Sequence, residues 1–213
     1  MAITTVISDF GGVLTTPLMR SFMAFQDQTG IQWEAMGHAM QRAAERNGAY
    51  PLFELEKGKM TEDTFLTLLQ DELEPELGHR PELHGFREIY FEALDPNEAM
   101  VELMSDLRRR GYRMALLTNN VREWEPLWRS LLPVDAIFEL IVDSAFVGMR
   151  KPDPEIYELT LERLGDPAPG ECLFVDDVEV NIEAARKLGL AAVHFRDNAQ
   201  AIAEIEAALD GAA

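Results

Sequence analysis

Residues 4–12 read TTVISDFGG, a β-branched run that stops at Asp9 and at a turn made by Gly11 and Gly12. β-branched side chains favour an extended strand, and glycine favours the turn that follows it. This stretch therefore predicts a first β-strand that carries Asp9 at its carboxyl end.

A long helical segment follows this strand. From about residue 17 to residue 94 the apolar side chains recur at helical spacing, as in Met19–Thr29, Glu34–Glu45 and Glu62–Leu73. Thr61 is a good N-cap for the last of these helices, and Glu62 begins its acidic first turn, where the helix dipole favours acids.

Beyond Asp95, helices alternate with short apolar strands. One helix is expected to begin at Asp95-Pro96-Asn97-Glu98, with the proline at its first position. Strands are expected near Met114–Leu117, Leu140–Val142, Cys172–Val175 and Ala191–His194, and helices near Glu123–Leu131, Glu155–Leu164 and Val180–Leu188. This alternation predicts a doubly wound parallel α/β sheet. We expect a Rossmann-like core of residues 1–14 and 95–213, interrupted by a helical domain of residues 15–94.

The composition narrows the class of protein. The 213 residues include 38 acidic and 19 basic side chains, and this net charge of −19 repels nucleic acids and anionic lipid. No apolar run approaches the roughly 20 residues of a membrane span, and the first residues lack the pattern of a secretory signal. The single cysteine, Cys172, is interpreted as a buried small hydrophobe. We expect a cytoplasmic protein without nucleic-acid or membrane partners.

Side chains capable of chemistry stand where the predicted strands end. In parallel α/β sheets, ligands bind beyond the carboxyl ends of the strands. The polar residues at or near these ends are Asp9, Thr118, Asn119, Lys151, Asp176 and Asp177. We therefore expect them to share one site.

These residues belong to four motifs. In chain order the motifs are Asp9-Phe10-Gly11-Gly12-Val13-Leu14, Leu117-Thr118-Asn119-Asn120, Lys151-Pro152-Asp153-Pro154 and Phe174-Val175-Asp176-Asp177 with Asn181 beyond it. Over nearly the whole chain, their order resembles the haloacid dehalogenase-like (HAD) hydrolase superfamily, which consists mostly of phosphatases. The helical insert matches the cap domain of that family. Its segment Phe53–Thr61 is similar to caps of bacterial glucose-1-phosphatases and of the phosphatase domain of soluble epoxide hydrolase.

The chemistry that suits such a site is phosphoryl transfer to a carboxylate. Attack by Asp9 on phosphorus would give an aspartyl-phosphate and divide one difficult displacement into two easier steps. Because both partners are anionic, a Mg²⁺ cofactor is expected between them. The expected metal ligands are Asp9, the carbonyl group of Gly11, Asp176 and Asp177. The expected catalytic and phosphate-binding partners are Thr118, Asn119 and Lys151.

One position departs from the family pattern. The resemblance implies an aspartate two residues after the nucleophile, where it protonates the leaving group, but this chain has Gly11. Such a general acid typically contributes about 10²–10⁴ in rate. Three interpretations stay open: a phosphatase of small phosphorylated metabolites, a 2-haloacid dehalogenase-type hydrolase, or a catalytically weak phosphate-binding or regulatory protein. The retained aspartate pair argues against dehalogenation, which needs no metal.

Other polar and aromatic residues are interpreted as structural. Asn181 is expected to steady the loop after Asp177, and Trp124 and Trp128 are expected to pack. Four histidines lack the spacing of metal ligands and are interpreted as incidental: His38, His79, His84 and His194. The sequence gives no oligomeric state, and it leaves four cap residues unplaced relative to the site: Arg20, Arg42, Tyr50 and Phe53.

Overall fold

Five parallel strands form the central sheet of the computed structural model, which describes residues 2–83 and 85–211 and so leaves His84 outside the described residues. The strands are β1 (Thr5–Ser8), β2 (Arg113–Thr118), β3 (Leu140–Asp143), β4 (Cys172–Asp176) and β5 (Ala191–His194). Their order in space is β3-β2-β1-β4-β5, with parallel pairing throughout. The doubly wound α/β sheet that the sequence predicts is confirmed.

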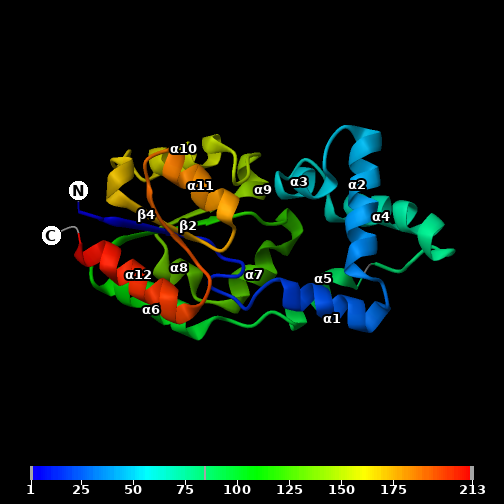
Figure 1. Cartoon of the computed structure of the whole chain (residues 1–213), viewed down its shortest axis with the longest axis horizontal. Coiled ribbons are helices and arrows are strands. Elements are labelled where there is room, and N and C mark those ends of the chain that lie inside the picture. Colours follow the sequence, from blue (N-terminus) through cyan, green and yellow to red (C-terminus); the bar gives the residue numbers. More distant parts are fainter. Residues whose placement is uncertain (1, 84, 212–213) are drawn as a thin grey trace.

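Helices cover both faces of this sheet. In β4, Leu173 and Val175 enter one apolar cluster and Phe174 enters the other, because successive side chains of a strand point to opposite faces. One face carries α6 (Glu98–Arg109), α8 (Val134–Ile137) and α12 (Asn198–Asp210), and the opposite face carries α10 (Pro154–Arg163) and α11 (Glu179–Lys187) (Figure 1). Shorter elements are η1 (Arg122–Trp124), α7 (Glu125–Leu131), α9 (Ser144–Val147) and η2 (Pro169–Glu171). No helix in the described ranges combines the length and the apolar character that crossing a membrane requires.

A group of helices lies between β1 and β2 in the sequence. Its members are α1 (Met19–Thr29), α2 (Trp33–Asn47), α3 (Pro51–Glu56), α4 (Glu62–Leu77) and α5 (Phe86–Glu92). They gather at the end of the molecule away from the two termini (Figure 1). The connecting segments pair, because the Thr16 N–H donates to the Asp95 carbonyl at 2.8 Å and the Asn97 N–H donates to the Leu14 carbonyl at 2.8 Å. This arrangement supports the proposed division into a core (1–14 and 95–213) and a cap (15–94).

The start of α6 differs from the expectation. Pro96 forms an isolated antiparallel bridge with Thr15, and the N-cap of α6 is Asn97, whose side chain makes no capping bond. The Asn97 side-chain amide instead donates to the Val13 carbonyl at 2.8 Å. The expectation of a helix with proline at its first position is therefore wrong, because pairing of the two connecting segments draws Pro96 into the bridge.

Candidate active site

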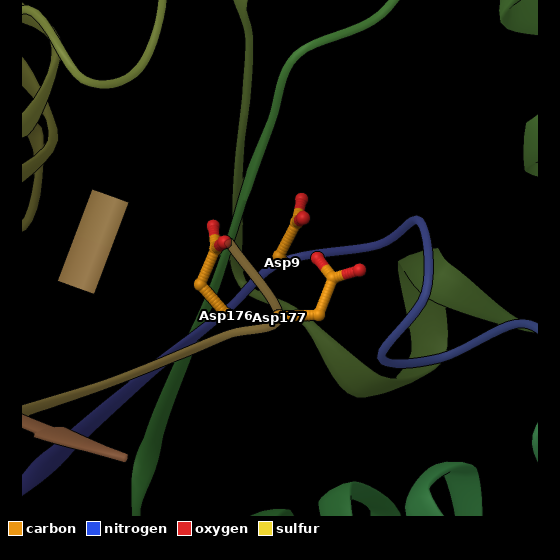
Figure 2. A group of neighbouring side chains, drawn as sticks. All are labelled: Asp9, Asp176 and Asp177. Atoms are coloured by element: carbon orange, nitrogen blue, oxygen red, sulfur yellow. The ribbon is translucent and has the colours of Figure 1, made fainter. Parts of the chain in front are cut away.

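Three aspartates meet at the carboxyl ends of the central strands. Asp9 follows β1, Asp176 ends β4 and Asp177 follows it, and Figure 2 shows their side chains close together at these ends. One carboxylate oxygen from each residue lies within 4.8 Å of the other two. The parallel register explains this convergence, since Ser8 of β1 pairs with Val175 of β4. The following residues of both strands therefore emerge side by side.

Lys151 joins two of these aspartates. Its side chain is 1% exposed, and its Nζ lies 2.7 Å from both Asp9 Oδ1 and Asp176 Oδ2. Asn119 fixes the loop that carries it, because the Asn119 side chain donates to the Lys151 carbonyl at 3.0 Å and accepts from the Lys151 N–H at 2.8 Å. The end of β2 thus holds a buried ammonium group against two carboxylates.

Asp176 and Asp177 are held by contacts that the sequence analysis did not specify. The Asn181 side chain donates to Asp176 Oδ1 at 3.0 Å and to Oδ2 at 3.1 Å, so Asn181 holds Asp176 itself rather than the loop after Asp177. Tyr157 supports this contact by donating its hydroxyl to the Asn181 carbonyl at 3.1 Å. A ring nitrogen of His194 lies 3.0 Å from the Asp177 carbonyl oxygen, so this histidine is not incidental to the site.

Burial and mutual repulsion set the electrostatics of the cluster. Burial raises the pKa of Asp9 to about 8; Lys151 opposes this shift, whereas Asp176 and Asp177 add to it. Burial, followed by the charge of Asp176, raises the pKa of Asp177 to about 6. If all three carboxylates were ionised, they would outnumber the single positive charge of Lys151, and a bound cation would favour their ionised forms. An oxygen-rich anionic donor set of this kind fits Mg²⁺, which prefers hard oxygen ligands.

Two glycines shape the floor of the site. Gly12 has a φ of +78°, and a Cβ atom placed on it would collide with the carboxylate of Asp177. A Cβ on Gly11 would lie 3.1 Å from Leu18, which covers this residue.

The buried hydroxyl of Thr118 lies 3.5 Å from the Asn119 carbonyl oxygen, at the outer limit of a hydrogen bond. The structure thus brings all the predicted site residues to one place, and their individual roles stay predictions.

The proposed cap reaches this site through α3. Glu56 Oε2 accepts from Arg150 Nε at 2.6 Å, and the Glu56 carbonyl accepts from the Ser144 hydroxyl at 2.6 Å. The ring of Phe53 lies 4.0 Å from the guanidinium carbon of Arg150, and the Tyr50 ring packs on Phe53. Of the unplaced cap residues, Phe53 therefore belongs near the site. Two others form ion pairs instead, Arg20 with Asp95 and Arg42 with Glu72 and Glu76.

Two adjoining hollows lie at the site. The first, which we call the polar cleft, has a volume of about 580 Å³ and includes Asp9, Lys151, Arg150 and Asn181 in its wall. The second, which we call the cap cavity, has a volume of about 310 Å³ and extends among apolar side chains of α1–α5. Both hollows have Gly11, Leu18, Glu56 and Asn119 in their walls, so the two hollows adjoin at the predicted site residues.

The chain belongs to the haloacid dehalogenase-like hydrolase family, whose sequence pattern matches residues 3–189. The family resemblance seen in the four motifs is confirmed, and the protein is a hydrolase of this class.

Individual relatives agree with this assignment. Rat bifunctional epoxide hydrolase 2 is 26% identical over 221 residues, covering 97% of this chain and 39% of the relative, so the chain spans about two fifths of that protein. A sesquiterpene phosphatase of Aspergillus oryzae is 33% identical over 112 residues, covering 49% of this chain and 53% of the relative. A HAD family enzyme of Bacteroides thetaiotaomicron has the same fold, with a TM-score of 0.69, 24% identity, and coverage of 92% of this chain and 95% of that one. That enzyme has also been solved with magnesium and inorganic phosphate.

Proposed function

We propose that this hydrolase is a magnesium-dependent phosphatase that acts on small phosphate monoesters through an aspartyl-phosphate on Asp9. The observation that carries this proposal is the convergence of Asp9, Asp176 and Asp177 with the buried ammonium of Lys151. Similarity to known phosphatases supports it, since the relatives include a sesquiterpene phosphatase and a glyceraldehyde 3-phosphate phosphatase.

In the first step, an Asp9 carboxylate oxygen attacks phosphorus, and the bond from phosphorus to the ester oxygen breaks. Lys151 orients the Asp9 carboxylate and stabilises charge that develops on the phosphoryl group. The Thr118 hydroxyl and the Asn119 backbone N–H donate to phosphoryl oxygens. In the second step, water attacks the phosphorus of the aspartyl-phosphate, which releases phosphate and restores Asp9.

The metal-binding residues in this proposal are Asp9, Asp176, Asp177 and the carbonyl group of Gly11. Bound there, Mg²⁺ supplies positive charge that offsets the repulsion between nucleophile and phosphate. Asp176 already makes hydrogen bonds through both oxygens, so its main task is to fix Lys151, and Asp177 has the freer carboxylate.

Glu56 is the best-placed replacement for the missing general acid. It lines both hollows together with Gly11, the position at which the family acid usually stands. Burial raises the pKa of its carboxyl group, although Arg150 opposes the shift, and this favours a protonated form able to donate. We propose that Glu56 protonates the leaving oxygen.

A leaving-group series tests this function. Turnover of aryl and alkyl phosphates should require Mg²⁺, stop with a chelator, and vanish in Asp9→Asn. Glu56→Gln should slow alkyl phosphates by about 10²–10⁴ and spare aryl phosphates, whose leaving groups need little protonation. Glu54→Gln, two residues earlier in α3, is the matched control and should change neither. Dehalogenation of 2-haloacids in the presence of chelator would support the alternative hydrolase and overturn the phosphatase.

A further inference from the structure

The cap cavity begins where the phosphate group is expected to bind. Thr118 and Asn119 line one end of it, and these residues also follow β2 at the carboxyl edge of the sheet. From there the cavity runs between α1, α2, α4 and α5, reaching Met40 and Leu69. A substrate with its phosphate at Asp9 therefore has space for the rest of its body in one direction, into the proposed cap.

The wall of this cavity is almost wholly apolar. Aromatic side chains line much of it, among them Phe22, Trp33, Phe65, Phe86, Tyr90 and Trp124. Two acidic residues line it, and both are already engaged. Glu62 accepts from Trp124 Nε1 at 2.8 Å and from an Arg87 nitrogen at 2.9 Å, and Glu56 accepts from Arg150 Nε at 2.6 Å. A sugar bound here would lose the hydrogen bonds of its hydroxyl groups to water without adequate replacements, which is costly.

The volume indicates how large a group the cavity accepts. An apolar protein cavity of about 150 Å³ holds one benzene molecule. The cap cavity has about 310 Å³, roughly twice that volume, and therefore suits an apolar group of about a dozen carbon atoms. It lies at the lower end of the range for small-molecule sites, which are mostly apolar with a few polar groups at one end.

We propose that the substrate is the phosphate monoester of an apolar alcohol, with the phosphate in the polar cleft and a hydrocarbon body of about ten to twelve carbons in the cap cavity. This inference rests on the proposed phosphatase function and names its substrate class. The expected substrates are therefore amphiphilic phosphates, and polar metabolites such as sugar phosphates are expected to be poor substrates.

A homologous series of alkyl phosphates tests the proposal. The ratio kcat/KM should rise about fourfold for each added methylene from ethyl to decyl phosphate, and then level off as the cavity fills. The measurements use concentrations below the micellar range, so that each substrate is a free monomer. Glucose 6-phosphate should be hydrolysed far less efficiently than decyl phosphate. A flat series, or a preference for glucose 6-phosphate, would overturn the substrate class and leave the phosphatase function standing.

Cavity-filling variants assign the effect to this cavity. Leu69 of α4 lines the cavity, and Leu69→Phe adds a phenyl ring that occupies part of its volume. This variant should lower the ratio of kcat/KM for decyl phosphate to that for ethyl phosphate at least tenfold. Met36→Phe does the same from α2, so that the test survives if one variant fails to fold. The control is Leu68→Phe, on the same helix but outside the cavity wall, which should keep the wild-type ratio. Unchanged ratios in both cavity variants would contradict the assignment.

Binding of dodecylphosphonate, which cannot be hydrolysed, separates this inference from the proposed function. With Mg²⁺ present, calorimetry should show binding that tightens with chain length and has a negative heat-capacity change, the marker of apolar burial. If such binding occurs and no phosphate ester turns over, the phosphatase function is wrong and the apolar site is supported. If dodecylphosphonate binds no better than ethylphosphonate, the apolar site is wrong.

Discussion

Replacing Lys151 by methionine should destabilise this protein strongly. The Lys151 side chain is 1% exposed and its Nζ lies 2.7 Å from carboxylate oxygens of both Asp9 and Asp176. Removing one partner of a buried ion pair leaves an uncompensated buried charge, which costs about 3–5 kcal/mol. Because two carboxylates lose their cation at once, we expect Lys151→Met to lose at least the upper part of that range at neutral pH.

Urea denaturation followed by circular dichroism measures this loss, with and without Mg²⁺. Bound Mg²⁺ should recover part of the stability of Lys151→Met, since a ligand that binds only the folded state stabilises it by mass action. The matched control is Lys57→Met. Lys57 also has a carboxylate partner, at 2.6 Å in Glu54, but this pair is more exposed, so its loss should cost no more than about 1 kcal/mol. Equal losses in the free energy of unfolding for the two substitutions would refute the reasoning. The distance between the charged atoms, rather than the burial of the pair, would then determine the loss.

Three further substitutions test other parts of the structure. Gly12→Ala should weaken Mg²⁺ binding by about 10–100-fold, because the new Cβ displaces Asp177, and unchanged affinity in a calorimetric titration would contradict that packing. Burial raises the pKa of Asp143 to about 7, so the folded state binds its proton more tightly than the unfolded state and stability falls as pH rises from about 4 to 7. Asp143→Asn should therefore gain stability over the wild type by a few kcal/mol at pH 8 and by little at pH 4, and a gain independent of pH would disprove the shift. Trp124→Phe should lower the free energy of unfolding by about 1–3 kcal/mol, since Glu62 loses its indole donor at 2.8 Å; an effect below about 0.5 kcal/mol in urea denaturation would refute this.

The sequence predicted the sheet and the strand-end acids for a simple geometric reason. Parallel strands end at the same edge, so Asp9, Asp176 and Thr118 come together once the strands pair in register. Four motifs in the expected order then suffice to name the family. The hydrogen bonds that Asn181 and His194 make to the aspartates are harder to predict. These two residues lie in a helix and a strand, where the apolar pattern of the sequence indicates only which side chains are buried.

Contacts between the proposed cap and core are even harder to predict from the sequence. Glu56 and Arg150 are 94 positions apart, and neither position has a spacing that marks the pair. The cap cavity was likewise not predicted, since its apolar side chains follow the same helical period as an ordinary filled core. Pro96 illustrates the same limit, because a pairing with distant Thr15 overrides its local preference for the first turn of a helix.

The most direct test of the mechanism is to trap the phosphorylated enzyme. The protein is mixed with Mg²⁺ and a radiolabelled phosphate ester, quenched in acid during turnover and digested, and the labelled peptide is located by mass spectrometry. The account predicts phosphate on the side chain of Asp9, and neither label nor turnover in Asp9→Asn. Phosphate on a different residue, or full turnover by Asp9→Asn, would contradict it.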